Sequence, residues 1–208
     1  LSFELLVDGD TIASVNARTH KRANQQAMDF IGSSIKRIVY LMEKQWDGPP
    51  FVFAKLDIKD GFWRMAVSNA DAWNFCYVLP SLTKSTDTAD IEIVVPNSLQ
   101  MGWCESPPFF CSASETARDI MDNIRHKPLP PHEFEHRMLP RPTGEHRATA
   151  TATTAIEVYV DDFIGVTNDA SKENLTALSR AMLHGVTLCS LPLESPDTPA
   201  GTRFLRKS

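Results

Sequence analysis

Apolar residues recur at three- and four-residue spacing in a long stretch of the N-terminal quarter of the chain. The residues that carry this period are Ala27, Ile31, Ile35, Ile38, Leu41 and Met42. Residues spaced in this way share one face of a helix, so the pattern predicts a helix from roughly Asn24 to Trp46. Gly48, followed by Pro49 and Pro50, ends it, because proline cannot continue a helix.

Strand-like patterns lie on both sides of this helix. Residues 3–7 and 11–15 flank an Asp8-Gly9-Asp10 turn and predict a hairpin, since Asp-Gly is a strong hairpin signal. Residues 51–57 form a largely apolar strand that ends at Asp57. A half-buried strand is predicted from the alternation of Trp73, Phe75, Tyr77 and Leu79, with residues 91–95 as its partner and residues 81–90 as the loop.

The second half of the chain shows the same two periods. Ser106 and Pro107 predict the N-cap and first position of a helix. Its apolar face comprises Phe110, Ala113, Ala117, Ile120, Met121 and Ile124. Residues 127–155 lack a period and are rich in proline, which predicts an inserted loop. The apolar runs 156–160 and 163–166 predict a hairpin, and a last helix follows Ser171 through Leu175, Leu178 and Met182 to near Gly185. This order predicts an α+β fold with helices packed on an antiparallel sheet.

Composition sets broad limits on the class of protein. The chain has 208 residues, of which 42% are hydrophobic and 23% charged, as in ordinary globular domains. It contains no apolar run of membrane-spanning length and no signal-peptide pattern. Its cysteines, Cys76, Cys104, Cys111 and Cys189, lack metal-binding spacing and are expected to be free thiols. We therefore expect an intracellular protein, cytoplasmic or nuclear, and the ends at Leu1 and Ser208 suggest a fragment of a longer one.

Carboxylates stand at the ends of two predicted strands. Asp161 and Asp162 are adjacent at the tip of the predicted hairpin, and Asp57 ends an earlier strand. Adjacent anions repel each other, and hard cations such as Mg²⁺ prefer oxygen ligands. A two-metal site for phosphoryl transfer needs several carboxylates from different segments. The alternatives are an ordinary Asp-Asp turn and a strand-end cap at Asp57.

Three segments together resemble the catalytic motifs of reverse transcriptases, in the order of that family. They are Leu56-Asp57-Ile58-Lys59-Asp60-Gly61-Phe62, then residues 99–110 around Gln100-Met101-Gly102-Trp103, and then Tyr159-Val160-Asp161-Asp162. With their connections they span roughly residues 50–170. The resemblance implies an RNA-directed DNA polymerase fragment, of the retrotransposon type, with a polymerase palm-like fold, partial fingers and no thumb. The implied parts are fingers-like residues 1–50, a palm-like domain over 51–190, and an irregular tail over 191–208.

The resemblance also implies roles for individual residues. Asp57, Asp161 and Asp162 would be catalytic and would bind two Mg²⁺ ions, or Mn²⁺, with Asp162 in a supporting position. Residues near the nucleotide would be Asp60, Gly61, Phe62, Met101, Gly102 and Ser106. Phe62 would lie beneath the incoming sugar and favour deoxynucleotides; read alone, it is an ordinary core residue, and Asp60-Gly61 is a plain turn. The implied partners are an RNA or DNA primer–template, dNTPs, and neighbouring polyprotein domains such as RNase H or integrase, without a membrane.

Some features depart from this family or complicate the prediction. Met101 stands where retroviral enzymes have Gln, so a glutamine contact to the nucleotide is not expected. The net charge of −5 disfavours phosphate binding, although the basic residues between Arg18 and Lys44 would face a nucleic-acid backbone or else form a solvated helix face. Arg18, Lys21 and Arg22 are weak candidates for gripping the triphosphate.

Residues 132–136 match the zinc-protease pattern H-E-x-x-H, which functions only when one helix carries both histidines. The flanking prolines oppose such a helix, and we reject a metalloprotease. Two other functions stay open. One is an inactive or truncated remnant that only binds nucleic acid. The other is an RNA-templated RNA polymerase, which Phe62 and Val160 disfavour.

Overall fold

The computed structural model describes residues 4–5, 13–45, 47–79, 92–138, 152–193 and 203–206. It is a mixed α+β structure with an antiparallel sheet, as predicted. The chain forms two compact units. The first consists of Leu1–Ala23 and Gly61–Phe110, and the second of Asn24–Asp60 and Cys111–Ser208.

The second unit is built on a four-stranded sheet in the order β6-β7-β3-β8. Its strands are β3 (Val52–Asp57), β6 (Thr154–Tyr159), β7 (Asp162–Thr167) and β8 (Arg203–Arg206). Every neighbouring pair is antiparallel. The strand ending at Asp57 and the hairpin of adjacent aspartates are therefore confirmed, and they pair with each other through β3 and β7.

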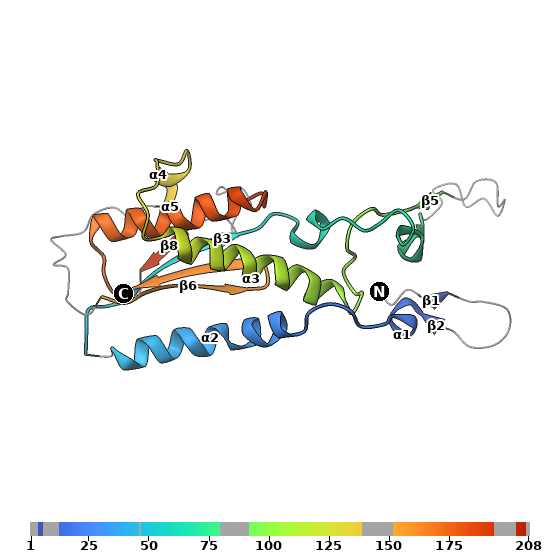
Figure 1. Ribbon diagram of the computed structural model, residues 1–208, viewed down its shortest axis with the longest axis horizontal. Coiled ribbons are helices and arrows are strands. Elements are labelled where there is room, and N and C mark those ends of the chain that lie inside the picture. Colours follow the sequence, from blue (N-terminus) through green and yellow to red (C-terminus); the bar gives the residue numbers. More distant parts are fainter. Residues whose placement is uncertain are drawn as a thin grey trace. The chain divides into compact units, whose positions relative to one another are not determined.

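Helices cover the two faces of this sheet, as Figure 1 shows. Leu178 and Met182 of α5 (Lys172–Leu188) pack beside Gly165 of β7 on one face. Ile38 of α2 (Gln26–Lys44) packs with Val166 on the other. Burial of side chains such as Leu178, which is fully enclosed, contributes about 1.5–3 kcal/mol each. This alternation of faces along each strand positions the polar residues discussed below.

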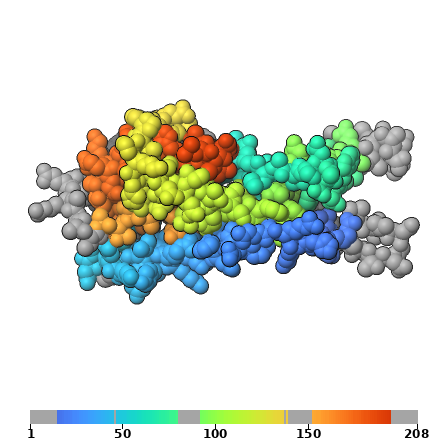
Figure 2. All heavy atoms as spheres, in the orientation of Figure 1, coloured from blue at the N-terminus to red at the C-terminus, as the bar shows by residue number. Residues whose placement is uncertain are grey.

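Both helices agree with their predicted extents, with small corrections. Ser171 caps α5 by accepting a hydrogen bond from the Asn174 N–H at 3.3 Å, and the helix continues one turn past Gly185. In α2, Ile35 is 52% exposed, although it was expected on the buried face. Ser34 is buried instead, because its hydroxyl donates to the Ile31 carbonyl at 2.9 Å. The α2 surface forms an uncovered band in the space-filling view (Figure 2).

One further helix precedes the expected inserted loop, and another lies within it. Helix α3 (Ser106–Ile124) has the predicted bounds, and a short helix α4 (Glu135–Met138) lies within residues 127–155. Residues 139–151 of this loop lie outside the described residues. In the second unit, α5 approaches α3 so closely that Gly185 has no room for a Cβ beside Met121.

The first unit is made of short elements. They are β1 (Glu4–Leu5), β2 (Ala13–Ser14), α1 (Val15–Arg18), the 3-10 helices η1 (Gly61–Arg64) and η2 (Ala72–Phe75), β4 (Tyr77–Val78) and β5 (Ile93–Val94). Strands β1 and β2 pair as expected, while their Asp8-Gly9-Asp10 turn and the loop 81–90 lie outside the described residues. The predicted strand through Trp73 and Phe75 is wrong. Both residues belong to η2, with Phe75 buried and Trp73 64% exposed, and only Tyr77–Val78 pairs with β5.

The grouping of elements differs from the expected parts in two respects. The expected boundary at residue 50 separates α2 from the sheet, whereas α2 contacts β6 within the second unit. The expectation of an irregular tail over 191–208 is wrong for Arg203–Arg206, which form β8 and pair with β3. A strand as short as this one has too few residues for a periodic signal.

Two expectations from composition can be compared with the structure. The four cysteines are free thiols, and burial raises the pKa of the Cys111 thiol to about 11. Within the described part of the chain, no helix combines the length and the apolar character needed to cross a membrane.

Candidate metal centre

The three predicted catalytic aspartates lie together at one end of the second unit's sheet. Asp57, the last residue of β3, stands opposite Asp162, the first residue of β7. Asp161 precedes Asp162 in the turn between β6 and β7. Each of the three carboxylates offers an oxygen within 4.8 Å of the other two. Segments distant in the sequence therefore meet at this point, as predicted.

The turn that presents Asp161 is tight and strained. Tyr159 pairs with Asp162, so Val160 and Asp161 alone form the hairpin loop. Val160 has φ 59°, a left-handed conformation that is unusual for a β-branched residue. The Ile58 N–H donates to the Asp161 carbonyl at 3.2 Å and attaches the turn to the end of β3. Strain of this kind persists where the surrounding structure holds it, commonly at functional sites.

Lys55 is the cation that faces this cluster. It lies two residues before Asp57 and therefore on the same face of β3. Its Nζ is 2.8 Å from Asp162 Oδ1 and 4.0 Å from Asp57 Oδ2. The hydrogen bond to Asp162 raises the pKa of Lys55. Burial raises the pKa of the Asp161 carboxyl, and the charge of Asp162 adds to this rise, while a backbone hydrogen bond and Lys55 oppose it.

The donor set fits a hard divalent cation. All three side chains supply carboxylate oxygens, which Mg²⁺ and Mn²⁺ prefer. Asp57 and Asp161 are half-buried, so each is held in place and still open to an incoming ligand. The three carboxylates repel one another at this distance, and a cation bound between them would neutralise that repulsion. Asp57, Asp161 and Asp162 are thus the residues that could hold a metal.

Three of the predicted nucleotide-binding residues follow Asp57 directly. Asp60 is exposed, belongs to the second unit and has φ 56°. Gly61 is buried in the first unit, where an added Cβ would lie 2.8 Å from the Phe110 ring. Phe62 packs against the same ring, with centroids 5.1 Å apart. Gly61 is therefore required by packing. Phe62 makes the contact expected of an ordinary core residue, which was the alternative to a role beneath the sugar.

The other three lie in the first unit, Met101 and Gly102 in the loop before α3 and Ser106 as the first residue of that helix. Met101 is 66% exposed, and Gly102 has φ 98°, which favours glycine. Ser106 was predicted to be an N-cap, but its hydroxyl donates to the Gln100 carbonyl at 2.7 Å and so closes the loop.

Glu105 organises the N-terminal basic segment in the first unit. It is almost fully buried and accepts hydrogen bonds from the Arg22 and Ala23 N–H groups at 2.6 and 2.7 Å. Beside this segment is a cavity of about 560 Å³. Its lining includes Arg18, His20, Arg22, Phe75, Trp103 and Phe109. Cations and flat rings in one cavity can bind a ligand that combines an anionic group with an aromatic ring.

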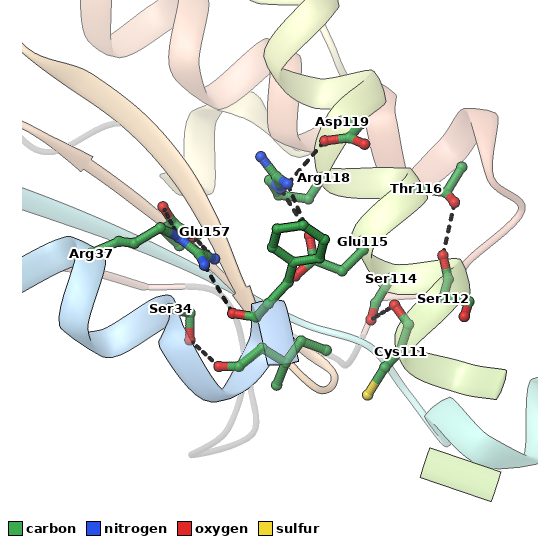
Figure 3. A network of polar contacts seen from close by, with 12 residues as sticks. Ser34, Arg37, Cys111, Ser112, Ser114, Glu115, Thr116, Arg118, Asp119 and Glu157 are labelled. Atoms are coloured by element: carbon green, nitrogen blue, oxygen red, sulfur yellow. Dashed lines mark hydrogen bonds and ion pairs between the residues drawn. The ribbon is translucent and has the colours of Figure 1, made fainter. Parts of the chain in front are cut away.

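A second charged cluster lies inside the second unit, where Figure 3 shows residues of α2, β6 and α3 converging. The Arg37 guanidinium donates to both carboxylate oxygens of the buried Glu157, with Nε 2.9 and 2.8 Å away. Arg118 pairs with Glu115 at 2.9 Å and with Asp119 at 3.0 Å. Arg37 is among the basic residues expected to face a nucleic-acid backbone or solvent, whereas its guanidinium donates to the buried Glu157 and to the Phe30 carbonyl.

The H-E-x-x-H segment does not form a protease site in the structure. His132 precedes α4, so one helix does not carry both histidines. Its Nδ1 accepts from the Phe134 N–H at 3.2 Å, while Glu135 pairs with Arg180 at 2.7 Å. The pattern therefore lacks the single helix that such a site requires, and Glu135 attaches the loop to α5.

No protein-family model matches this chain, and no curated protein does.

The sequence analysis does not identify three residues that organise the charged clusters described above. Lys55 could have been found from its two-residue spacing to Asp57. Glu105 and Glu157 had no comparable signal, because their partners are far away in the sequence.

Proposed function

We propose that this chain is the catalytic part of an RNA-directed DNA polymerase of a retroelement. The reaction is attack of a primer 3′-hydroxyl on the α-phosphorus of a dNTP, with release of pyrophosphate. The observation that carries the proposal is the meeting of Asp57, Asp161 and Asp162 within 4.8 Å at the junction of β3 and the β6–β7 hairpin. Asp57 belongs to the first, and Asp161 and Asp162 to the third, of the motifs that resemble reverse transcriptases.

The protein's part in this reaction is mainly positioning and charge. β3 and the strained turn hold the Asp57 and Asp161 oxygens in place, and this rigidity favours catalysis. When bound, a pair of divalent ions would neutralise charge on the triphosphate. Asp162, whose Oδ1 accepts a hydrogen bond from the Lys55 ammonium at 2.8 Å, would support Asp57 and Asp161 in holding these ions. A palm-like arrangement of the antiparallel sheet and its helices is part of this proposal.

Nucleic-acid contact is supported by the first unit despite the net charge of −5. Arg18, His20 and Arg22 line one cavity together with aromatic rings. Such a surface suits a primer–template, whose phosphates bind cations and whose unpaired bases stack on rings. The distribution of charge matters more for this binding than its sum.

The test is primer extension by the full chain on an RNA template, with Mg²⁺ or Mn²⁺ and dNTPs. Asp161→Asn keeps the shape of the side chain and removes its charge. We expect extension to fall by about a thousandfold, because the lost interaction is worth several kcal/mol in the transition state. Asp29→Asn is the matched control, since Asp29 is an exposed acid on α2, and it should retain full activity.

Other outcomes identify the alternatives. Template binding without extension by the wild-type chain would indicate a remnant that only binds nucleic acid. Equal use of ribonucleotides would indicate an RNA polymerase and would remove the proposed role of Phe62. Extension that survives in Asp161→Asn would contradict the assignment of the aspartates.

A further inference from the structure

Lys55 lies where it can control how the aspartate cluster takes up a cation. On β3 it stands opposite Ile164, and Asp57 stands opposite Asp162. Lys55 and Asp162 are therefore diagonal neighbours on one face of the sheet, a separation that a long side chain can span. The contact follows from strand register rather than from a loop.

The ammonium makes unequal contacts with the carboxylates. It donates to Asp162 Oδ1 at 2.8 Å and lies 4.0 Å from Asp57 Oδ2. The Lys55 side chain is 36% exposed, so it can leave this position for solvent. A cation that uses the same Asp162 oxygen must displace the ammonium, and a cation at the other two aspartates is repelled by it.

We propose that Lys55 is a built-in competitor that lowers the affinity of the three aspartates for divalent cations. The inference rests on the proposed function in one respect, that these carboxylates bind such a cation. Lys55 is a positioning residue here: it holds Asp162 and limits cation uptake, and takes no part in the chemical step. Replacing it removes both the repulsion and the competing hydrogen bond.

A purely structural lysine would act in the opposite direction. If Lys55 only held the carboxylates in a binding arrangement, its loss would let them separate and would weaken cation binding. If Lys55 competes, its loss strengthens binding, although the protein without metal becomes less stable. The sign of the change in affinity therefore separates the two roles.

The experiment measures Mn²⁺ binding to the full chain by the loss of the free-ion signal in electron paramagnetic resonance. We expect Lys55→Met to bind Mn²⁺ on the order of tenfold more tightly than wild type, from the removal of one charge at about 4 Å. Lys55→Arg keeps the charge and should stay close to wild type. Lys172→Met, at an exposed position in the first turn of α5, controls for net charge and should leave the affinity unchanged.

A second variant guards against a folding defect. Lys55→Gln keeps a hydrogen-bond donor and removes only the charge, so it should also tighten Mn²⁺ binding. In thermal unfolding, Lys55→Met should melt below wild type in EDTA and gain more from added Mn²⁺, because tighter binding stabilises the folded state more.

Unchanged or weaker Mn²⁺ binding by folded Lys55→Met and Lys55→Gln overturns the inference. Primer extension by the wild-type chain is recorded in parallel. An active wild type with no tightening in the variants refutes the role of Lys55 alone. Tighter binding in the variants without extension by wild type supports the role of Lys55 and refutes the polymerase.

Discussion

The two charged clusters of the second unit hold the same number of carboxylates and differ in the cations beside them. At the sheet's end, Asp57, Asp161 and Asp162 lie within 4.8 Å of one another, beside the ammonium of Lys55. In the second cluster, which extends from the buried Glu157 to the exposed Asp119, three carboxylates face the guanidinium groups of Arg37 and Arg118. The acids of this second cluster are Glu115, Asp119 and Glu157.

The difference separates a structural cluster from a functional one. The planar Arg37 fork engages both oxygens of Glu157, which is the geometry of a satisfied pair. The three aspartates lie close together above a turn that is strained at Val160, and like-charge repulsion and backbone strain both disfavour this arrangement. We infer that the Arg37–Glu157 pair contributes to stability, whereas the aspartates are retained for binding.

The largest change in stability is expected from breaking the interior pair. Arg37→Met leaves Glu157 buried without its partner, which costs about 3–5 kcal/mol for fully buried pairs. Because the Arg37 side chain is 32% exposed, we expect a loss of about 2 kcal/mol. Urea unfolding measures it, with Arg37→Lys as a control that keeps the charge without the fork. A loss below about 0.5 kcal/mol would show that the pair contributes little.

A smaller change is expected when both partners are replaced together. Arg37→Met combined with Glu157→Leu substitutes apolar groups for the pair and leaves no unpaired charge. We expect the double variant to recover to within about 1 kcal/mol of wild type. The same urea experiment gives the coupling between the two positions. A double variant less stable than Arg37→Met would mean that Glu157 stabilises the interior by other contacts.

The smallest change is expected at the aspartates, with the opposite sign. The pKa of Asp161 is raised by burial, so the folded protein binds its proton more strongly than the unfolded chain. The stability cost of its charge is absent below the ordinary aspartate pKa, grows as pH rises from there toward the raised pKa, and is constant above it.

Asp161→Asn removes this cost. In EDTA at pH 7 the variant should gain at most about 0.5 kcal/mol, the scale of substitutions outside the core. The gain should disappear below about pH 4. Asp29→Asn is again the control. A loss of stability at neutral pH would mean that Asp161 stabilises the fold, as Glu157 does, and would contradict the distinction between the two clusters.

Much of the fold could be predicted because its signals are local. The helix from residue 26 to 44, the strand to Asp57 and the hairpin of adjacent aspartates each show a period and an end signal. Trp73 and Phe75 were misassigned, because alternation over a few residues also fits a 3-10 turn with one buried ring. Strand β8 forms through its pairing with β3, and so its four residues alone do not reveal it.

Some residues of the charged clusters could be predicted from the sequence and others could not. The three aspartates could be predicted because motif order indicated that distant segments meet. The partner of Arg37 could not, since Glu157 lies 120 residues away and the contact depends on how α2 packs on β6. The requirement for Gly61 was likewise hidden, because it comes from the Phe110 ring rather than from a turn.

The central claim is that Asp57, Asp161 and Asp162 hold divalent cations. Crystals of the wild-type chain and of Asp161→Asn, soaked in Mn²⁺, would test it through anomalous difference maps. We predict a peak within about 2.2 Å of the carboxylate oxygens in wild type, and a lost or much weaker peak in the variant. A wild-type map with Mn²⁺ bound elsewhere and none beside these aspartates would contradict the account.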